Sequence, residues 1–185
     1  LSDSPPERDL DWTESGITGA WRFSNRLWRL VANNAAKLPP AGADTGPDAG
    51  NADVRRAVHA AIAGVTEDLE AFHFNRSVAR VHELVNALSD VDPDTDGAAL
   101  REGLETVTLL IGPMMPHLAE ELWRLLGRDT LVADSPWPVA EESLLVQDTV
   151  KLAVQVRGKM RGTVEIPHGA DQATAEKAAL ALATV

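Results

Sequence analysis

Histidines and carboxylates spaced for one face of a helix are the first residues in this sequence that could do chemistry. Glu70 and His73 stand three positions apart, which is half of the Glu-x-x-His pattern that holds two metal ions in some helical bundles. Such a site requires a second pair on a neighbouring helix, and none lies in another segment that we expect to be helical. His117 and Glu120 lack the second His of a zinc pair at helix spacing. We therefore predict no metal site.

Motifs of a nucleotide-binding or nucleophilic catalytic site are absent from the sequence. It contains no Gly-rich phosphate loop, no Gly-x-Ser-x-Gly and no Cys. We expect no catalytic site in these residues and no cofactor bound by them. The lack of Cys fits a reducing compartment, so we predict a cytoplasmic location.

Three arginines form the first candidate binding surface. Arg22, Arg26 and Arg29 recur at i, i+4 and i+7, so a helix would present them together on one face. Such a stripe could contact a phosphate backbone. The alternative is an ordinary solvated face, which is what most charge runs are.

A second group of cations surrounds a glycine near the end of the chain. Arg157, Lys159 and Arg161 flank Gly158, where the absence of a side chain would let a hairpin approach a phosphate backbone closely. The alternative is that these charges protect a strand edge from aggregation.

The whole chain of 185 residues is acidic, with a net charge of −11. Proteins that bind nucleic acid on their own usually carry a basic excess, because neutralising phosphates supplies most of their affinity. A nucleic-acid contact would therefore come from local cations, within a larger protein that shares the binding. The alternative is that the charge only maintains solubility. No apolar run approaches the ~20 residues that cross a bilayer, so we predict no membrane association.

Apolar residues recur at helical spacing over most of the chain. The predicted helices cover residues 16–37, 52–72, a third segment from about 75, then 98–111 and 117–126. Ser15 and Asn75 are candidate N-caps, Pro116 suits a first turn, and Gly127 suits the position after a helix. Residues 39–50 read as a mobile loop. Successive amphipathic helices with mostly short connections predict an antiparallel bundle.

The first predicted helix carries a broad apolar arc that we expect to face the core. Ile17, Trp21, Leu27, Trp28 and Val31 all lie within it, on the side away from the three arginines. We therefore expect Trp28 to be buried.

The pattern changes to alternation from Val150 onward, which predicts two strands. Gly158-Lys159 is placed as a two-residue type II′ turn, and residues 172–182 look helical. A β-β-α run of this size cannot bury a core alone.

The sequence therefore predicts a mostly α fold, with an antiparallel bundle of about five helices followed by a small, incomplete β-β-α unit. We divide the chain into a lead-in over 1–15, the bundle over 16–134, a linker over 135–149 and part of a second domain over 150–185.

Several motifs follow one another in a recognisable order. They are Ser4-Pro5-Pro6-Glu7-Arg8-Asp9-Leu10-Asp11-Trp12, Gly19-Ala20-Trp21-Arg22-Phe23, Asn25-Arg26-Leu27-Trp28, Val65-Thr66-Glu67-Asp68, Phe74-Asn75, Pro116-His117-Leu118-Ala119-Glu120-Glu121-Leu122-Trp123, Pro136-Trp137-Pro138, and Val154-Gln155-Val156-Arg157-Gly158-Lys159-Met160-Arg161-Gly162. In this order they resemble the C-terminal part of bacterial-type leucyl-tRNA synthetases. The middle motifs resemble class I synthetases in general, whereas the last motif narrows the resemblance to leucine.

The resemblance implies a helical domain of the anticodon-binding type, followed by the start of a small C-terminal domain. The implied partner is tRNA-Leu, braced by the cations of both groups. The parent enzyme would join leucine to it with ATP and Mg²⁺, using active sites in upstream domains of the same polypeptide, and would be a monomer. Arg157 departs from the family, which commonly has Asn there.

Two other interpretations stay open. The chain could be the corresponding region of an isoleucyl- or valyl-tRNA synthetase. It could instead be a helical protein-interaction module whose arginine stripe meets an acidic partner.

Overall fold

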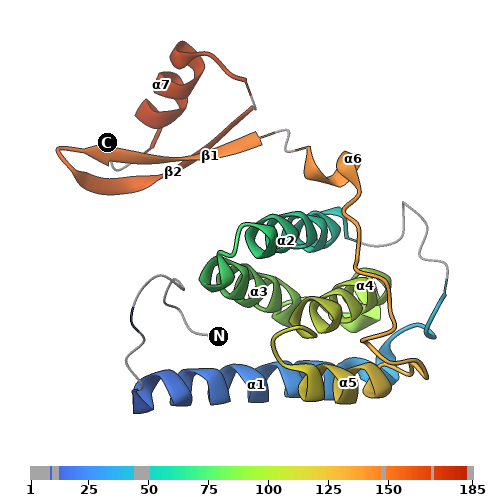
Figure 1. Ribbon diagram of the computed structural model, residues 1–185. Helices are drawn as coiled ribbons and strands as arrows, with labels where there is room; N and C mark the ends of the chain where they lie inside the picture. The colour runs from blue at the N-terminus through green and yellow to red at the C-terminus, as the bar shows by residue number, and fades with distance from the viewer. Residues whose placement is uncertain (1–8, 10–12, 44–50, 147–148, 168, 183–185) are drawn as a thin grey trace. The chain divides into compact units, whose positions relative to one another are not determined.

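The computed structural model describes residues 9, 13–43, 51–146, 149–167 and 169–182, and the chain divides into two compact units (Figure 1). The first unit covers residues 1–144 and the second residues 145–185. The predicted lead-in over 1–15 and the predicted loop over 39–50 fall largely outside the described residues. Among the described residues, no helix has the length and apolar character needed to cross a membrane.

Among the described residues, five helices form the bundle of the first unit. They are α1 (Glu14–Asn34), α2 (Ala52–Glu70), α3 (Phe74–Ser89), α4 (Pro93–Ile111) and α5 (Pro116–Leu125), with a short 3-10 helix η1 (Ala35–Lys37) after α1. α4 packs against α2, α3 and α5, while α1 lies along α5 and also touches α3. The predicted mostly α fold, a bundle of about five helices and then a small β unit, is confirmed.

The core of the bundle lies where the apolar stripes of these helices meet. Leu88 of α3, Leu104 and Leu110 of α4, and Leu122 of α5 are fully buried. Each follows the i, i+3, i+4 spacing that predicted its helix. Burial of such side chains is the main force that keeps short helices folded in water.

Three helix starts differ from the prediction. α4 begins at Pro93 rather than residue 98, because Asp92 caps it by accepting the Asp94 N–H at 2.9 Å and Pro93 suits the first turn. α3 begins at Phe74, so Asn75 lies inside the first turn and is not the cap. α1 is capped by Thr13, whose hydroxyl accepts the Gly16 N–H, and not by Ser15.

The end of α2 is unusual because Phe72 follows it with a φ of 60°. The His73 N–H reaches the Asp68 carbonyl at 2.7 Å and the Phe72 N–H reaches the Leu69 carbonyl at 3.1 Å. These two bonds make a Schellman ending, in which glycine usually takes the left-handed position. The helix therefore ends two residues before the predicted boundary at Phe72.

The apolar arc of α1 is only partly buried, and the prediction for Trp28 is wrong. Leu27 and Val31 are fully buried, whereas Trp28 is 40% exposed, Trp21 68% and Ile17 47%. The three exposed residues lie at one edge of the arc, to one side of Leu27 and Val31. Amphipathic spacing alone does not show where contact with neighbouring helices stops.

The second unit is a hairpin of β1 (Thr149–Val156) and β2 (Lys159–Pro167), followed by α7 (Gln172–Leu180). The strands are antiparallel, with Leu152 opposite Val164 and Val150 opposite Ile166. α7 packs on β2, and Val164 and Ile166 are buried. A four-residue helix, α6 (Glu142–Leu145), spans the boundary between the units.

The hairpin turn differs from the prediction by one residue. Val156 pairs with Lys159, so the loop is Arg157-Gly158, and both have positive φ, 52° and 77°. Positive φ at both positions is typical of a type I′ turn, whose twist matches that of the strands, rather than the predicted type II′ turn at Gly158-Lys159.

We expect Leu27→Ala to lower the free energy of unfolding by about 2–5 kcal/mol, because Leu27 is fully buried. Trp28→Ala should cost clearly less, about 1–2 kcal/mol, because much of its ring already contacts water. Denaturant unfolding followed by circular dichroism measures both. An equal loss for the two variants would contradict the placement of Trp28.

Replacing Arg157 by Asn should stabilise the hairpin by about 0.5–1 kcal/mol, because Asn tolerates the left-handed conformation better than Arg does. Amide exchange along β1 and β2 should slow accordingly. Lys159→Asn removes the same charge outside the loop and serves as the control. Equal exchange in both variants would show that the turn conformation is not the cause.

Candidate nucleic-acid interface

The predicted arginine stripe lies on the solvent side of α1. Arg22, Arg26 and Arg29 are all exposed, while Leu27 and Val31 on the other side of the helix are buried. The helix repeat brings the three guanidinium groups along one line. The only carboxylate within α1 is that of Glu14 in its first turn, so this face is locally basic on an acidic protein.

Ion pairing separates these three arginines from the others in the bundle. Within the described residues, none of the three forms an ion pair with a carboxylate. The seven remaining described arginines of the bundle each do so: Arg55, Arg56, Arg76, Arg80, Arg101, Arg124 and Arg128. Among the described residues of the bundle, the stripe is therefore the group of arginines whose charge no carboxylate offsets in an ion pair.

Arg26 also acts on a histidine of the neighbouring helix. The His82 ring stacks on Phe23 with their centroids 4.1 Å apart. Burial of this imidazole lowers the pKa of His82, and the charge of Arg26 lowers it further. His82 is therefore neutral at pH 7, and the positive charge of this face comes from the three arginines.

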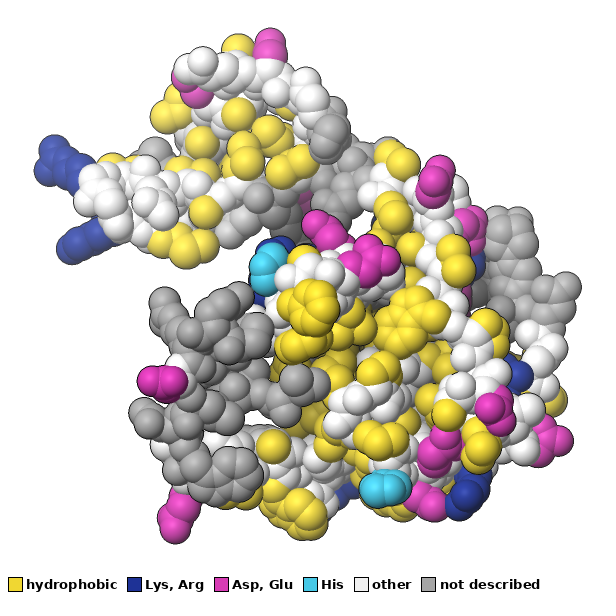
Figure 2. Space-filling model, in the orientation of Figure 1, with side chains coloured by type: hydrophobic (Ala, Val, Ile, Leu, Met, Phe, Trp, Pro, Cys, Tyr) yellow, Lys and Arg dark blue, Asp and Glu magenta, His cyan; other side chains and the backbone are white. Residues whose placement is uncertain are grey.

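The second predicted group of cations lies at the tip of the hairpin. Arg157, Lys159 and Arg161 are exposed, and Figure 2 shows dark-blue side chains projecting from this end of the hairpin. Arg157 occupies the loop. Arg161 is the extra residue of a β-bulge, because Val154 pairs with Gly162 and Gln155 with Met160. Bulges redirect side chains, so the three cations do not simply alternate between the two faces.

Two of the residues considered for a metal site, His73 and Glu120, contact other residues of the protein. Among the described residues, no three His, Asp or Glu gather to hold an ion. His73 lies 4.0 Å from the buried Asp68, and Glu70 is exposed. The Glu120 carboxylate accepts the N–H groups of Val132 and Ala133 at 3.1 and 3.3 Å.

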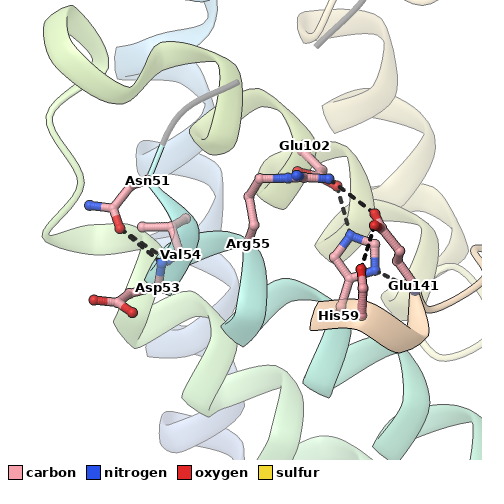
Figure 3. Close-up of polar contacts among 8 residues, drawn as sticks. Asn51, Asp53, Val54, Arg55, His59, Glu102 and Glu141 are labelled. Atoms are coloured by element: carbon pink, nitrogen blue, oxygen red, sulfur yellow. Dashed lines mark hydrogen bonds and ion pairs between the residues drawn. The ribbon is translucent and has the colours of Figure 1, made fainter. Parts of the chain in front are cut away.

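A polar network that the sequence did not predict connects α2, α4 and the segment after α5 (Figure 3). Arg55 Nε lies 2.8 Å from Glu102 Oε2, and His59 Nε2 lies 2.9 Å from Glu102 Oε1. The Glu141 N–H donates to His59 Nδ1 at 2.9 Å. Arg55 and His59 stand at i, i+4 on α2, which is the only local signal of this site.

The chain matches a known family over most of its length. Residues 51–178 match the family described as "Anticodon-binding domain of tRNA ligase". The chain belongs to this family. The match includes α2 to α5 and most of the second unit, and it begins after α1.

Leucine–tRNA ligases are among the proteins that are similar to this chain. Those of Paramagnetospirillum magneticum and Rhodospirillum rubrum are 58% and 53% identical over 98% and 100% of this chain. The chain spans about a fifth of their length, 21% and 22%. It also matches a crystal structure of the ternary complex of Agrobacterium radiobacter K84 agnB2 LeuRS-tRNA-LeuAMS, with a TM-score of 0.73 and 32% identity over 94% of this chain and 23% of that one.

The lowered pKa of His82 gives the bundle a pH dependence that can be isolated. The contribution of His82 to the stability of the fold is complete above pH 6.5, the ordinary pKa of a His in the unfolded chain. This contribution is lost as the pH falls through the lower pKa that His82 has in the folded state. His82→Phe keeps an aromatic ring beside Phe23 and removes the titration. We expect the melting temperature of the wild type to fall more than that of the variant between pH 7 and pH 5.5. Parallel curves would exclude His82 as the cause.

Proposed function

We propose that this chain is the tRNA-binding region of a leucine–tRNA ligase. Membership of the anticodon-binding domain family and the likeness to leucine–tRNA ligases support this assignment. The likeness to a LeuRS–tRNA complex points to tRNA as the ligand. The same comparisons favour leucine over the isoleucine and valine alternatives, and tRNA over an acidic protein partner.

One observation carries the assignment of the tRNA contact. The arginines of α1 have no ion pair among the described residues, although each other described arginine of the bundle has one. Cations that are already paired gain little from a phosphate, because binding must first break the existing pair. Arg22, Arg26 and Arg29 can neutralise phosphates and release condensed counterions without that cost.

The hairpin supplies a second contact in this proposal. Arg157 lies in the loop beside Gly158, Lys159 begins β2, and Arg161 is the extra residue of the bulge in β2; all three are exposed. Contacts of this kind fix the register of a nucleic acid without reading its sequence. Both groups of cations would therefore position tRNA-Leu rather than identify it.

The complete ligase would provide everything else. It would join leucine to tRNA-Leu with ATP and Mg²⁺ in upstream domains of the same polypeptide, as a cytoplasmic monomer. The described residues contribute binding to this reaction and no chemistry of their own.

In the full-length ligase, we expect Arg22→Ala with Arg29→Ala to weaken tRNA binding and to reduce its salt dependence by up to about two ion equivalents. Lys159→Ala with Arg161→Ala should act similarly. Adenylate formation should be unchanged. The measurement is tRNA affinity over a range of salt concentrations.

The matched control removes two paired arginines that reach solvent, the half-buried Arg56 and the exposed Arg124. Arg56 pairs with Asp53 and Arg124 with Glu121, so Arg56→Ala with Arg124→Ala changes the net charge by the same amount. This variant should leave the salt slope near that of the wild type. Equal effects in the stripe and control variants would mean that net charge, and not the stripe, governs binding.

A further inference from the structure

We propose that His82 of α3 is a further tRNA-binding residue, which takes up a proton when a phosphate of tRNA binds to Arg26. The cationic face of α1 then continues onto α3 in the complex. The inference deepens the proposed function, because it rests on contact between the arginine stripe and tRNA.

α3 packs against α1 (Figure 1), and the His82 ring lies at this contact. It stacks on the ring of Phe23, with the centroids 4.1 Å apart and an angle of 29° between the ring planes. Phe23 itself packs against the core of the bundle, so it holds the imidazole in place. Arg26 follows Phe23 by three positions on α1, and residues at this spacing are neighbours on a helix surface. The stack therefore places His82 beside the middle arginine of the stripe.

The ring nitrogens of His82 are open to a ligand. Neither has a hydrogen-bond partner among the described residues. Neither belongs to the completely buried polar atoms that lack a partner, which lie on Asp68, Ser77 and Arg101. Both nitrogens of this half-buried side chain therefore reach the surface. An imidazole that served only the core would satisfy its nitrogens within the protein, whereas His82 keeps them available at the edge of the stripe.

Arg26 is the charged group that acts on His82 among the described residues. Burial lowers the pKa of the imidazole, and the positive charge of Arg26 lowers it further. Glu83, the next residue, points about 100° away around α3. α2 and α4 also pack against α3, and within the described part of the chain no carboxylate of either helix pairs with His82. The residues of α3 that lie one turn from His82 do not titrate: Val78, Ala79, Val85 and Asn86.

A phosphate bound to Arg26 reverses this balance. Its negative charge offsets that of the guanidinium and favours the charged form of a nearby imidazole. The proton comes from the solvent, and the imidazolium then donates a charge-assisted hydrogen bond to a phosphate oxygen. The face of the Phe23 ring also attracts a cation. Binding of tRNA therefore raises the pKa of His82 and adds a fourth cation to the stripe.

Binding and protonation are linked, so each favours the other by the same factor. If the phosphate only returns the pKa of His82 to its ordinary value of about 6.5, tRNA affinity rises roughly threefold as the pH falls from 8 to 6. Affinity rises on acidification because the complex holds more protons than the free protein over this range. Arginine stays charged throughout, so the stripe itself contributes no such change.

The test measures the affinity of the full-length ligase for tRNA-Leu at pH 8 and at pH 6, at constant salt. The ratio of the two dissociation constants is compared between variants, so that a loss of affinity that does not depend on pH cancels. His82→Phe keeps a ring beside Phe23 and removes the titration. His82→Gln keeps a hydrogen-bond donor and does not titrate either. His117→Phe removes an exposed imidazole from α5 and serves as the matched control.

We expect the pH ratio of the wild type and of His117→Phe to exceed that of both His82 variants roughly threefold. Titration calorimetry at about pH 6.5, in two buffers of different ionisation enthalpy, counts the protons directly. Binding of tRNA by the wild type should take up a fraction of a proton that both His82 variants lack.

Equal pH ratios in the wild type and the His82 variants would overturn the proposal, and so would equal proton uptake. A lower ratio in His117→Phe alone would also overturn it, because the coupled proton would then lie on α5.

The stripe variant separates this inference from the proposed function. If Arg22→Ala with Arg29→Ala leaves tRNA affinity unchanged, the proposed contact with the stripe is wrong, whatever His82 does. If that variant weakens binding while the wild type and the His82 variants share one pH ratio, only the role of His82 fails.

Discussion

A protein with a net charge of −11 can attract a polyanion only through cations that its own carboxylates have not neutralised. Most arginines of the bundle form ion pairs with carboxylates of the same bundle, either between helices or within one helix. α1 is the exception, because it carries three arginines and a single carboxylate, that of Glu14 in its first turn. The separation of paired from unpaired cations is therefore what allows an acidic domain to present a basic surface, and the packing of α1 against α3 and α5 keeps that surface turned to solvent.

The paired arginines serve the fold in a different way. Arg55 and Arg101 are almost completely buried, and each contacts a carboxylate of α4. Breaking such a buried pair leaves an uncompensated charge and is strongly destabilising. The same chemistry extends beyond the helices, because Arg55 and His59 also hold Glu141. Ion pairs that stabilise the bundle thus also fix the segment that leads to the second unit.

Local patterns in the sequence predicted the helices and the hairpin, because amphipathic period and turn residues act over a few positions. They did not predict features that depend on contacts between helices or on backbone geometry. Trp28 shares the apolar arc of Leu27 yet reaches solvent, since the arc is wider than the surface that its neighbours cover. The start of α4 was missed although Asp92-Pro93 is a recognisable cap. The bond between His59 and Glu141 joins residues 82 positions apart, and no local period encodes such a pair. The six candidate tRNA-binding cations were chosen from the sequence, and their role stays a prediction.

The central claim is that the arginine face of α1 touches tRNA. A photo-reactive amino acid at Asn33, an exposed uncharged residue in line with the stripe, tests it without removing any cation. Thr95, also exposed and uncharged but on α4, is the matched position. The account predicts that irradiation of the full-length ligase with tRNA-Leu yields a covalent adduct from position 33 and little from position 95. An adduct from position 95 alone, or equal yields from both, would contradict it.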